Sequence, residues 1–136
     1  MKRRAFVLLN RGVNSVVRRL RLRRFRGGDL LYLTTTGRRS GKTRTNPLLY
    51  LPYGSGWAVV ASNGGANWQP GWWLNLKAGT PATAVIDGRS VAVTGSEVTG
   101  SERAELWRRF NDVVDYDAYQ RKVDRQIAVV ALQPVE

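Results

Sequence analysis

Residues 36–44 combine four basic side chains with hydroxyls and two glycines, the groups that proteins use to bind phosphate. Gly41-Lys42-Thr43 is similar to the end of a nucleotide phosphate loop. That motif needs four residues between its glycines, whereas three separate Gly37 from Gly41, and it needs a helix where Asn46-Pro47 leads into a strand pattern. A nucleotide triphosphatase is therefore rejected. The segment predicts either a phosphate-binding loop or a solvated basic turn.

Three further segments contain groups that could hold or face a flat ring. Small residues at 61–65 end a strand pattern and would let a ring approach the backbone closely. Tryptophans at 68, 72 and 73 could wall such a ring. Tyr116 and Tyr119 share one face of a helix and could donate hydrogen bonds. Each segment also has a structural explanation, namely a glycine turn, core packing and amphipathic helix packing.

The 136-residue chain contains neither cysteine nor histidine. Their absence excludes disulfides, thiolate chemistry, the commonest general base and the commonest zinc ligand, so no metal site is predicted. If the protein is an enzyme, a bound cofactor has to supply the reactive group.

Strands dominate the elements that must position these groups. Alternating or β-branched runs predict strands at 30–36, 45–51, 57–62, 82–86, 90–98 and 127–132, and helices are predicted at 71–78, after Thr99 and at 115–124. Asp87-Gly88 indicates a tight hairpin, and Thr99 with Glu102 indicates a capping box. Sequential strands with tight turns favour antiparallel pairing. We therefore predict an α+β, mainly β fold, in which about six mostly antiparallel strands form a small closed or half-open barrel with flanking helices.

Residues 1–26 carry ten basic side chains and no acidic one, which leaves +2 of the net charge of +12 for the rest of the chain. Apolar residues at helical spacing predict a basic amphipathic N-terminal helix over 4–22, so we divide the chain into an arm, 1–28, and a domain, 29–136. The arm could contact an anionic membrane surface or bind nucleic acid, and its apolar face favours the membrane. No run of about 18 apolar residues is present, so no membrane-spanning helix is predicted. We expect a cytoplasmic monomer or homodimer that could lie peripherally on the inner face of the cell membrane.

Five blocks of residues, taken in order, resemble the deazaflavin (F420)-dependent nitroreductase and F420H2-dependent quinone reductase family. They are 33–41 (LTTTGRRSG), 44–48 (RTNPL), 61–65 (ASNGG), 72–78 (WWLNLKA) and Tyr119-Gln120 with Asp124-Arg125. The resemblance runs over roughly residues 30–134, essentially the whole domain. It implies a split β-barrel related to flavin-binding reductases, with reduced coenzyme F420 as hydride donor and a quinone or nitroaromatic as acceptor. FMN is an alternative cofactor. A non-catalytic F420 or FMN carrier, or a membrane-associated binding module, is an alternative function.

The resemblance also implies roles for individual residues. The phosphate and oligoglutamate tail of F420 would be bound by Arg38, Arg39, Ser40 and Arg44. The residues along the cofactor would be Thr45, Asn46, Pro47, Leu48 and Leu49, and those beside the deazaflavin ring would be Val60, Ala61, Ser62 and Asn63. The other side of the ring would be closed by Gly71, Trp72, Trp73, Leu74 and Asn75. The catalytic residues facing the acceptor would be Ser62, Tyr116 and Tyr119, and Tyr116 would also touch the cofactor.

Overall fold

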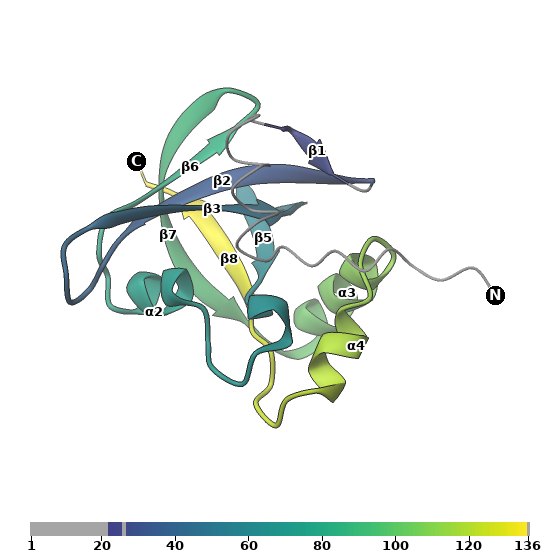
Figure 1. The fold of residues 1–136 in the computed structure, drawn as a ribbon. Helices are drawn as coiled ribbons and strands as arrows, with labels where there is room; N and C mark the ends of the chain where they lie inside the picture. The colour runs from purple at the N-terminus through teal and green to yellow at the C-terminus, as the bar shows by residue number, and fades with distance from the viewer. Residues whose placement is uncertain (1–21, 26, 136) are drawn as a thin grey trace.

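An antiparallel sheet forms the body of the protein in a computed structural model that describes residues 22–25 and 27–135 (Figure 1). Within these residues the strands are β1 (Arg24–Phe25), β2 (Gly28–Thr36), β3 (Thr43–Leu49), β4 (Leu51–Tyr53), β5 (Gly56–Val60), β6 (Ala82–Ile86), β7 (Arg89–Val98) and β8 (Val129–Pro134). Their order is β1-β2-β6-β7-β8-β5-β4, with β3 on the other edge of β2, and every pair is antiparallel. The helix predicted at 4–22 lies outside the described residues except for Leu22, and the division at residue 28 stays a prediction.

The sheet does not close, because the strand that would close it breaks in two. β3 ends at Leu49 and pairs with β2, whereas β4 begins at Leu51 and pairs with β5. Tyr50 lies between them, and its amide donates to the carbonyl of Asp29 at 3.1 Å. Among the described strands no ladder joins β3 to β5, so the predicted split barrel is confirmed in its half-open form. β1 and β4 are the strands that the sequence patterns did not predict, since each is at most three residues long.

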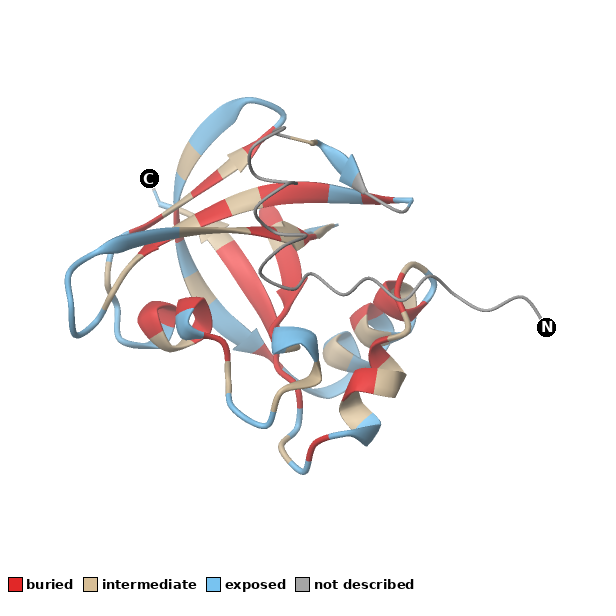
Figure 2. Cartoon of the chain, viewed as in Figure 1, coloured by how far each residue is buried: buried red, intermediate tan, exposed pale blue. Residues whose placement is uncertain are grey.

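Helices cover two parts of the sheet and bury a core against each (Figure 2). α2 (Gly71–Lys77) packs on β2 and β7, and it comes close because Gly95 of β7 lacks a side chain: a Cβ there would lie 2.8 Å from Leu76 Cδ1. α3 (Gly100–Asn111) and α4 (Tyr116–Arg121) share the second core with residues of β5 and β8. A single 3-10 turn, η1 (Asn63–Gly65), follows β5. No helix in the described part of the chain combines the length and the apolar character needed to span a bilayer.

The turns and helix starts agree with the sequence patterns, with one exception. Asp87 and Gly88 have φ values of +51° and +79°, which fits the predicted tight hairpin between β6 and β7. Thr99 precedes α3 as predicted, but its side chain makes no capping hydrogen bond. Glu102 accepts instead from the Tyr53 hydroxyl at 2.9 Å. The predicted capping box is therefore wrong, because a tertiary partner engages the carboxylate that the local motif would use.

Candidate functional site

The β2–β3 hairpin, the end of β5, η1 and α2 surround a cavity of about 670 Å³. It is lined by most of the residues that the resemblance implied, namely Arg38, Arg39, Ser40, Arg44, Asn46, Pro47, Leu48, Leu49, Val60, Ser62, Asn63, Gly71, Trp72, Asn75 and Tyr116. Four further lining residues were not predicted: Thr35, Gly37, Gly64 and Pro70. Gly37, Gly64 and Pro70 each adjoin a predicted residue in the sequence, so extending those blocks by one residue would have found them, whereas Thr35 lies three positions before Arg38. The structure thus brings separate blocks of the sequence to one cavity, while the role of each residue there stays a prediction.

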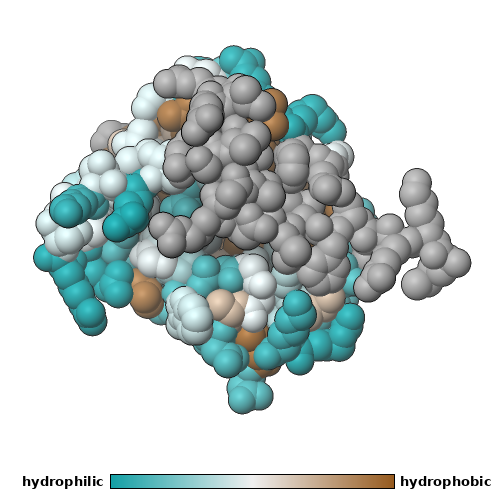
Figure 3. Space-filling view, viewed as in Figure 1, coloured by the Kyte–Doolittle hydropathy of each residue, from teal (hydrophilic) through white to brown (hydrophobic). Residues whose placement is uncertain are grey.

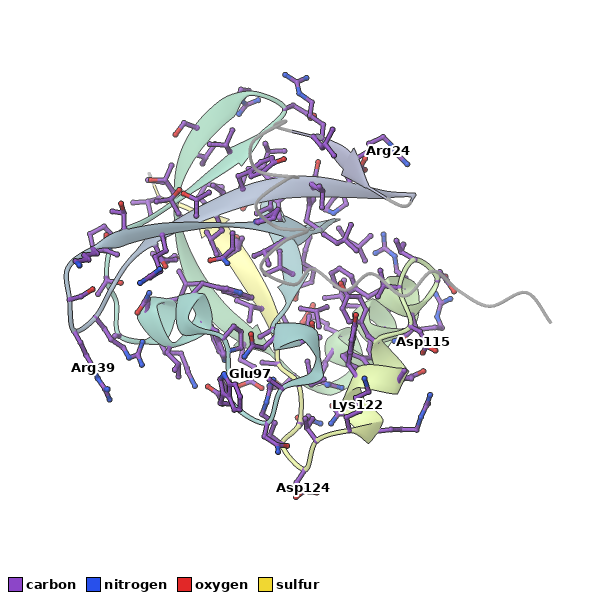
Figure 4. The ribbon with its side chains drawn as sticks, viewed as in Figure 1. Arg24, Arg39, Glu97, Asp115, Lys122 and Asp124 are labelled. Carbon is purple, nitrogen blue, oxygen red and sulfur yellow. The ribbon has the colours of Figure 1, made fainter. Side chains whose placement is uncertain are left out.

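The turn that joins β2 to β3, residues 37–42, is closed by its own hydrogen bonds. The amide of Gly37 donates to the carbonyl of Lys42 at 2.7 Å, and that of Gly41 donates to the carbonyl of Gly37 at 2.9 Å. Ser40 Oγ accepts from the amide of Lys42 at 3.2 Å. Arg39 extends from this end of the hairpin (Figure 4), where hydrophilic side chains gather on the surface (Figure 3). A closed turn of this kind presents its guanidinium groups from a fixed backbone.

Asn75 of α2 ties this cationic turn to the core. Its Oδ1 accepts from the backbone amide and from Nη1 of Arg38, each at 3.1 Å. Its Nδ2 donates to Thr35 Oγ1 at 3.0 Å, in a contact where Asn75 is 6% and Thr35 1% exposed. Both ends of the Asn75 amide are therefore engaged by the protein. Asn75, implied to contact the cofactor, also holds Arg38 in place at the cavity.

Replacing Asn75 with leucine is expected to lower the free energy of unfolding by about 2–3 kcal/mol. The leucine fills a similar volume but leaves the buried Thr35 hydroxyl and the Arg38 amide without their partner. Urea unfolding measures the change, and Asn67→Leu serves as the control, because Asn67 is exposed and does not line the cavity. We expect the control to change stability by less than about 0.5 kcal/mol. A loss of equal size in both variants would contradict this role for Asn75.

Part of the cavity wall is apolar. Pro47 and Leu48 contribute from β3, Val60 comes from the end of β5, and Trp72 comes from α2. Val60 and Trp72 are each 6% exposed, so core packing sets their positions. A cavity lined by both guanidinium groups and aliphatic and aromatic surface suits a ligand that has an anionic part and a flat apolar part.

The structure does not bring five of the implied residues to the cavity: Thr45, Ala61, Trp73, Leu74 and Tyr119. Strand alternation turns Thr45 to the other face of β3, where its hydroxyl lies 2.7 Å from that of Thr34 beside a separate cavity of about 490 Å³. Ala61 and Trp73 are buried in the core beneath the site, and Leu74 is half-buried on α2. Tyr119 is 1% exposed and packs among apolar side chains. Their contact with a ligand stays a prediction.

Tyr116 lines the cavity from within an aromatic cluster on α3 and α4. Its ring centroid lies 5.9 Å from that of Phe110, edge to face, and 6.0 Å from that of Tyr119. Burial, and to a smaller extent the neighbouring Tyr119, raises the pKa of Tyr116. Burial, followed by the charge of Asp115, raises the pKa of Tyr119 to about 12. Both phenols therefore keep their protons at neutral pH, so Tyr116 can donate a hydrogen bond into the cavity.

The raised pKa values of the two tyrosines predict a loss of stability in alkaline solution. In the unfolded chain a phenol loses its proton at pH about 10, whereas Tyr119 keeps its proton in the folded protein until about 12. Between these values the folded state binds more protons, so its stability is complete below pH 10 and falls as pH rises. Urea unfolding from pH 8 to 12 measures the slope. Tyr119→Phe is expected to make the fall of the unfolding free energy with pH shallower. An unchanged slope would contradict the contribution of Tyr119 to this fall.

Known proteins that are similar to this chain share one description. A family model described as F420H(2)-dependent quinone reductase matches residues 4–134. A Mycobacterium tuberculosis protein named F420H(2)-dependent quinone reductase is 35% identical over 106 residues, which cover 75% of this chain and 71% of that protein. Both observations point to one family.

Solved structures extend the comparison to the fold. One described as an F420-H2 dependent reductase matches with a TM-score of 0.66 and 33% identity, covering 76% of this chain and 93% of that chain. Another, described as a domain-swapped dimer, matches with a TM-score of 0.67 and 33% identity, covering 76% of this chain and 79% of that chain. The haem storage protein HutZ from Vibrio cholerae is 14% identical, with a TM-score of 0.53 over 79% of this chain and 82% of its own, and shares the fold alone.

Proposed function

The chain belongs to the F420H(2)-dependent quinone reductase family, and we propose on this premise that it transfers a hydride from F420H2 to a quinone in the cavity described above. Membership makes the protein an oxidoreductase whose cofactor is coenzyme F420. The observation that carries the proposal is that guanidinium groups and apolar side chains line one cavity. This combination matches a cofactor that joins an anionic tail to a flat ring.

The donor set of the cavity fits F420. Arg38, Arg39, Ser40 and Arg44 would hold its phosphate and its oligoglutamate tail, because guanidinium forks and hydroxyls are strong partners for both groups. Leu48, Val60 and Trp72 would wall the ring, since their surfaces are apolar and fixed by packing. When bound, F420H2 supplies a hydride, that is, two electrons and a proton, to the acceptor.

The protein's own residues would align the reactants and stabilise the charge that develops on the quinone. The apolar wall excludes water, which strengthens each hydrogen bond inside the cavity. Holding two reactants in a near-attack arrangement can lower the barrier by about 7–11 kcal/mol. The hydroxyls of Tyr116 and Ser62, two residues that line the cavity, would donate to a quinone oxygen as it gains negative charge.

Mixing the purified protein with F420H2 and menadione tests the proposal. Oxidation of F420H2, measured as the return of the visible absorbance of oxidised F420, should require the protein. Binding of F420 without turnover would instead support a non-catalytic carrier, and no binding at all would overturn the proposal. A parallel reaction with a nitroaromatic acceptor decides whether the cavity also accepts that class, and a titration with FMN decides whether it distinguishes F420 from a less anionic flavin.

A further inference from the structure

Arg125 lies on the segment between α4 and β8 and binds the backbone of the cavity wall. Its Nη1 donates to the carbonyl of Ala61 at 3.2 Å. Its Nη2 donates to the carbonyls of Ser62 and Ala66, each at 3.1 Å. One guanidinium therefore binds carbonyls on both sides of η1, the turn that contributes Asn63 and Gly64 to the cavity.

Backbone carbonyls are the described partners of this cation, which forms no ion pair with any carboxylate in the described part of the chain. Burial lowers the pKa of Arg125, as expected for a charge held by neutral groups, but a guanidinium remains charged at neutral pH. Arginine suits this position because its planar fork offers several donors in fixed directions. A lysine would bring the same charge, but its single ammonium cannot reach three carbonyls in the same geometry.

The side chain of Gln120 in α4 supports the backbone around Arg125 through two hydrogen bonds. Its Nε2 donates to the carbonyl of Arg125 at 2.7 Å, and its Oε1 accepts from the amide of Ile127 at 2.9 Å. On the same wall, Tyr119 packs against Gly65, where a Cβ would come within 3.0 Å of Tyr119 Cδ1. Residues 61–66 are thus held by α4 through Tyr119 and by the segment after α4 through Arg125.

We propose that Arg125 is a positioning residue that, supported by Gln120, sets the place of Ser62 and Asn63 in the cavity wall and so aligns the reactants for hydride transfer. The catalytic consequence rests on the proposed function, whereas the structural consequence does not. Arg125 itself does not line the cavity, so it acts through the backbone that it binds. Because a displacement of about 1 Å can lower a rate by up to about 100-fold, losing this contact should reduce kcat without removing the cofactor site.

Amide hydrogen exchange of the protein without cofactor tests the structural part, in Arg125→Lys and Arg125→Met. The informative amides are those of Gly65 and Ala66, which bond within the segment at 2.9 and 3.1 Å. We expect the exchange of these amides to accelerate about tenfold in both variants. Without the guanidinium hydrogen bonds, local opening of the segment costs less free energy. Unchanged exchange in Arg125→Met, or full protection in Arg125→Lys, would overturn the proposal. If Arg125→Met does not fold, Gln120→Met tests the same support and is expected to accelerate the same amides.

Kinetics test the catalytic part on the same variants. We expect kcat for menadione to fall about tenfold in Arg125→Lys, with the dissociation constant of F420 changed by less than about threefold. A dissociation constant that rises as much as kcat falls would mean that Arg125 supports binding in general, and would overturn the positioning role. Arg121→Lys is the control, since Arg121 is exposed on α4 and does not line the cavity, and it should match the wild type. If the wild type does not turn over, the proposed function fails, while the exchange experiment still decides the role of Arg125.

Discussion

Replacing Arg38 and Arg39 together with glutamine is expected to raise the dissociation constant of F420 by about 100-fold. Each guanidinium would make a charge-assisted hydrogen bond to the anionic part of the cofactor, worth about 1.5 kcal/mol, the low end of the usual range, because both side chains are exposed. Asn75 holds the Arg38 guanidinium in advance of binding, at 3.1 Å, so little further ordering is needed when an anion arrives.

Titration of F420 into the protein at two salt concentrations measures this effect. The affinity of the wild type should fall as salt increases, and that of the double variant should fall less, because two of the screened charges are gone. The control removes the same net charge elsewhere, with Arg89→Gln and Arg121→Gln, two exposed arginines that do not line the cavity. Equal weakening in both double variants would show that the net charge attracts the cofactor, and the role assigned to the cationic turn would be wrong.

Much of this site could be predicted because its residues lie in short contiguous blocks. From Leu31 onward in β2, the buried positions Leu31, Leu33 and Thr35 alternate with half-buried neighbours, as expected for a strand with one face in a core. The basic turn follows directly, and its glycines mark it as a turn. The local structure of each block depends on residues only a few positions away. Local sequence patterns and the family resemblance can therefore predict it.

Contacts between distant residues could not be predicted in this way. Asn75 and Arg38 are 37 positions apart, and Arg125 and Ser62 are 63 positions apart. Nothing in the neighbourhood of Asn75 or Arg125 indicates which backbone group each one will meet. The same limit explains why the predicted capping box is wrong. Glu102 accepts a hydrogen bond from Tyr53, 49 positions away, in place of a local one.

The direction in which each side chain of a block points could not be predicted from the sequence either. Thr45 belongs to a block that runs along the cavity, yet alternation turns its side chain to the opposite face of β3. Tyr116 and Tyr119 share a helix face in the sequence, but only Tyr116 lines the cavity, because Tyr119 is taken into the core beside Gly65. The two tyrosines therefore offer a matched pair of variants.

Tyr116→Phe is expected to lower kcat for the quinone by about 100-fold, with the dissociation constant of F420 changed by less than about threefold. The change removes one hydroxyl and keeps the ring, whose packing against Phe110 at 5.9 Å holds the site in place. The hydroxyl is a donor throughout the neutral range because burial raises the pKa of Tyr116. It would matter most in the transition state, when charge builds on the quinone oxygen, so its loss should reduce kcat more than ground-state binding.

Tyr119→Phe separates this role from a general effect of removing a buried hydroxyl. Tyr119 is 1% exposed and does not line the cavity, so we expect its variant to keep kcat within about threefold of the wild type. Equal losses in both variants would mean that the aromatic cluster acts as a unit, and the assignment of Tyr116 as the donor would fail. A loss confined to Tyr119→Phe would restore the role that the family resemblance implied for it. If neither tyrosine variant loses activity but Ser62→Ala does, the donor to the quinone is Ser62, which lies between β5 and η1, and the site stabilises the developing charge from the wall that Arg125 holds.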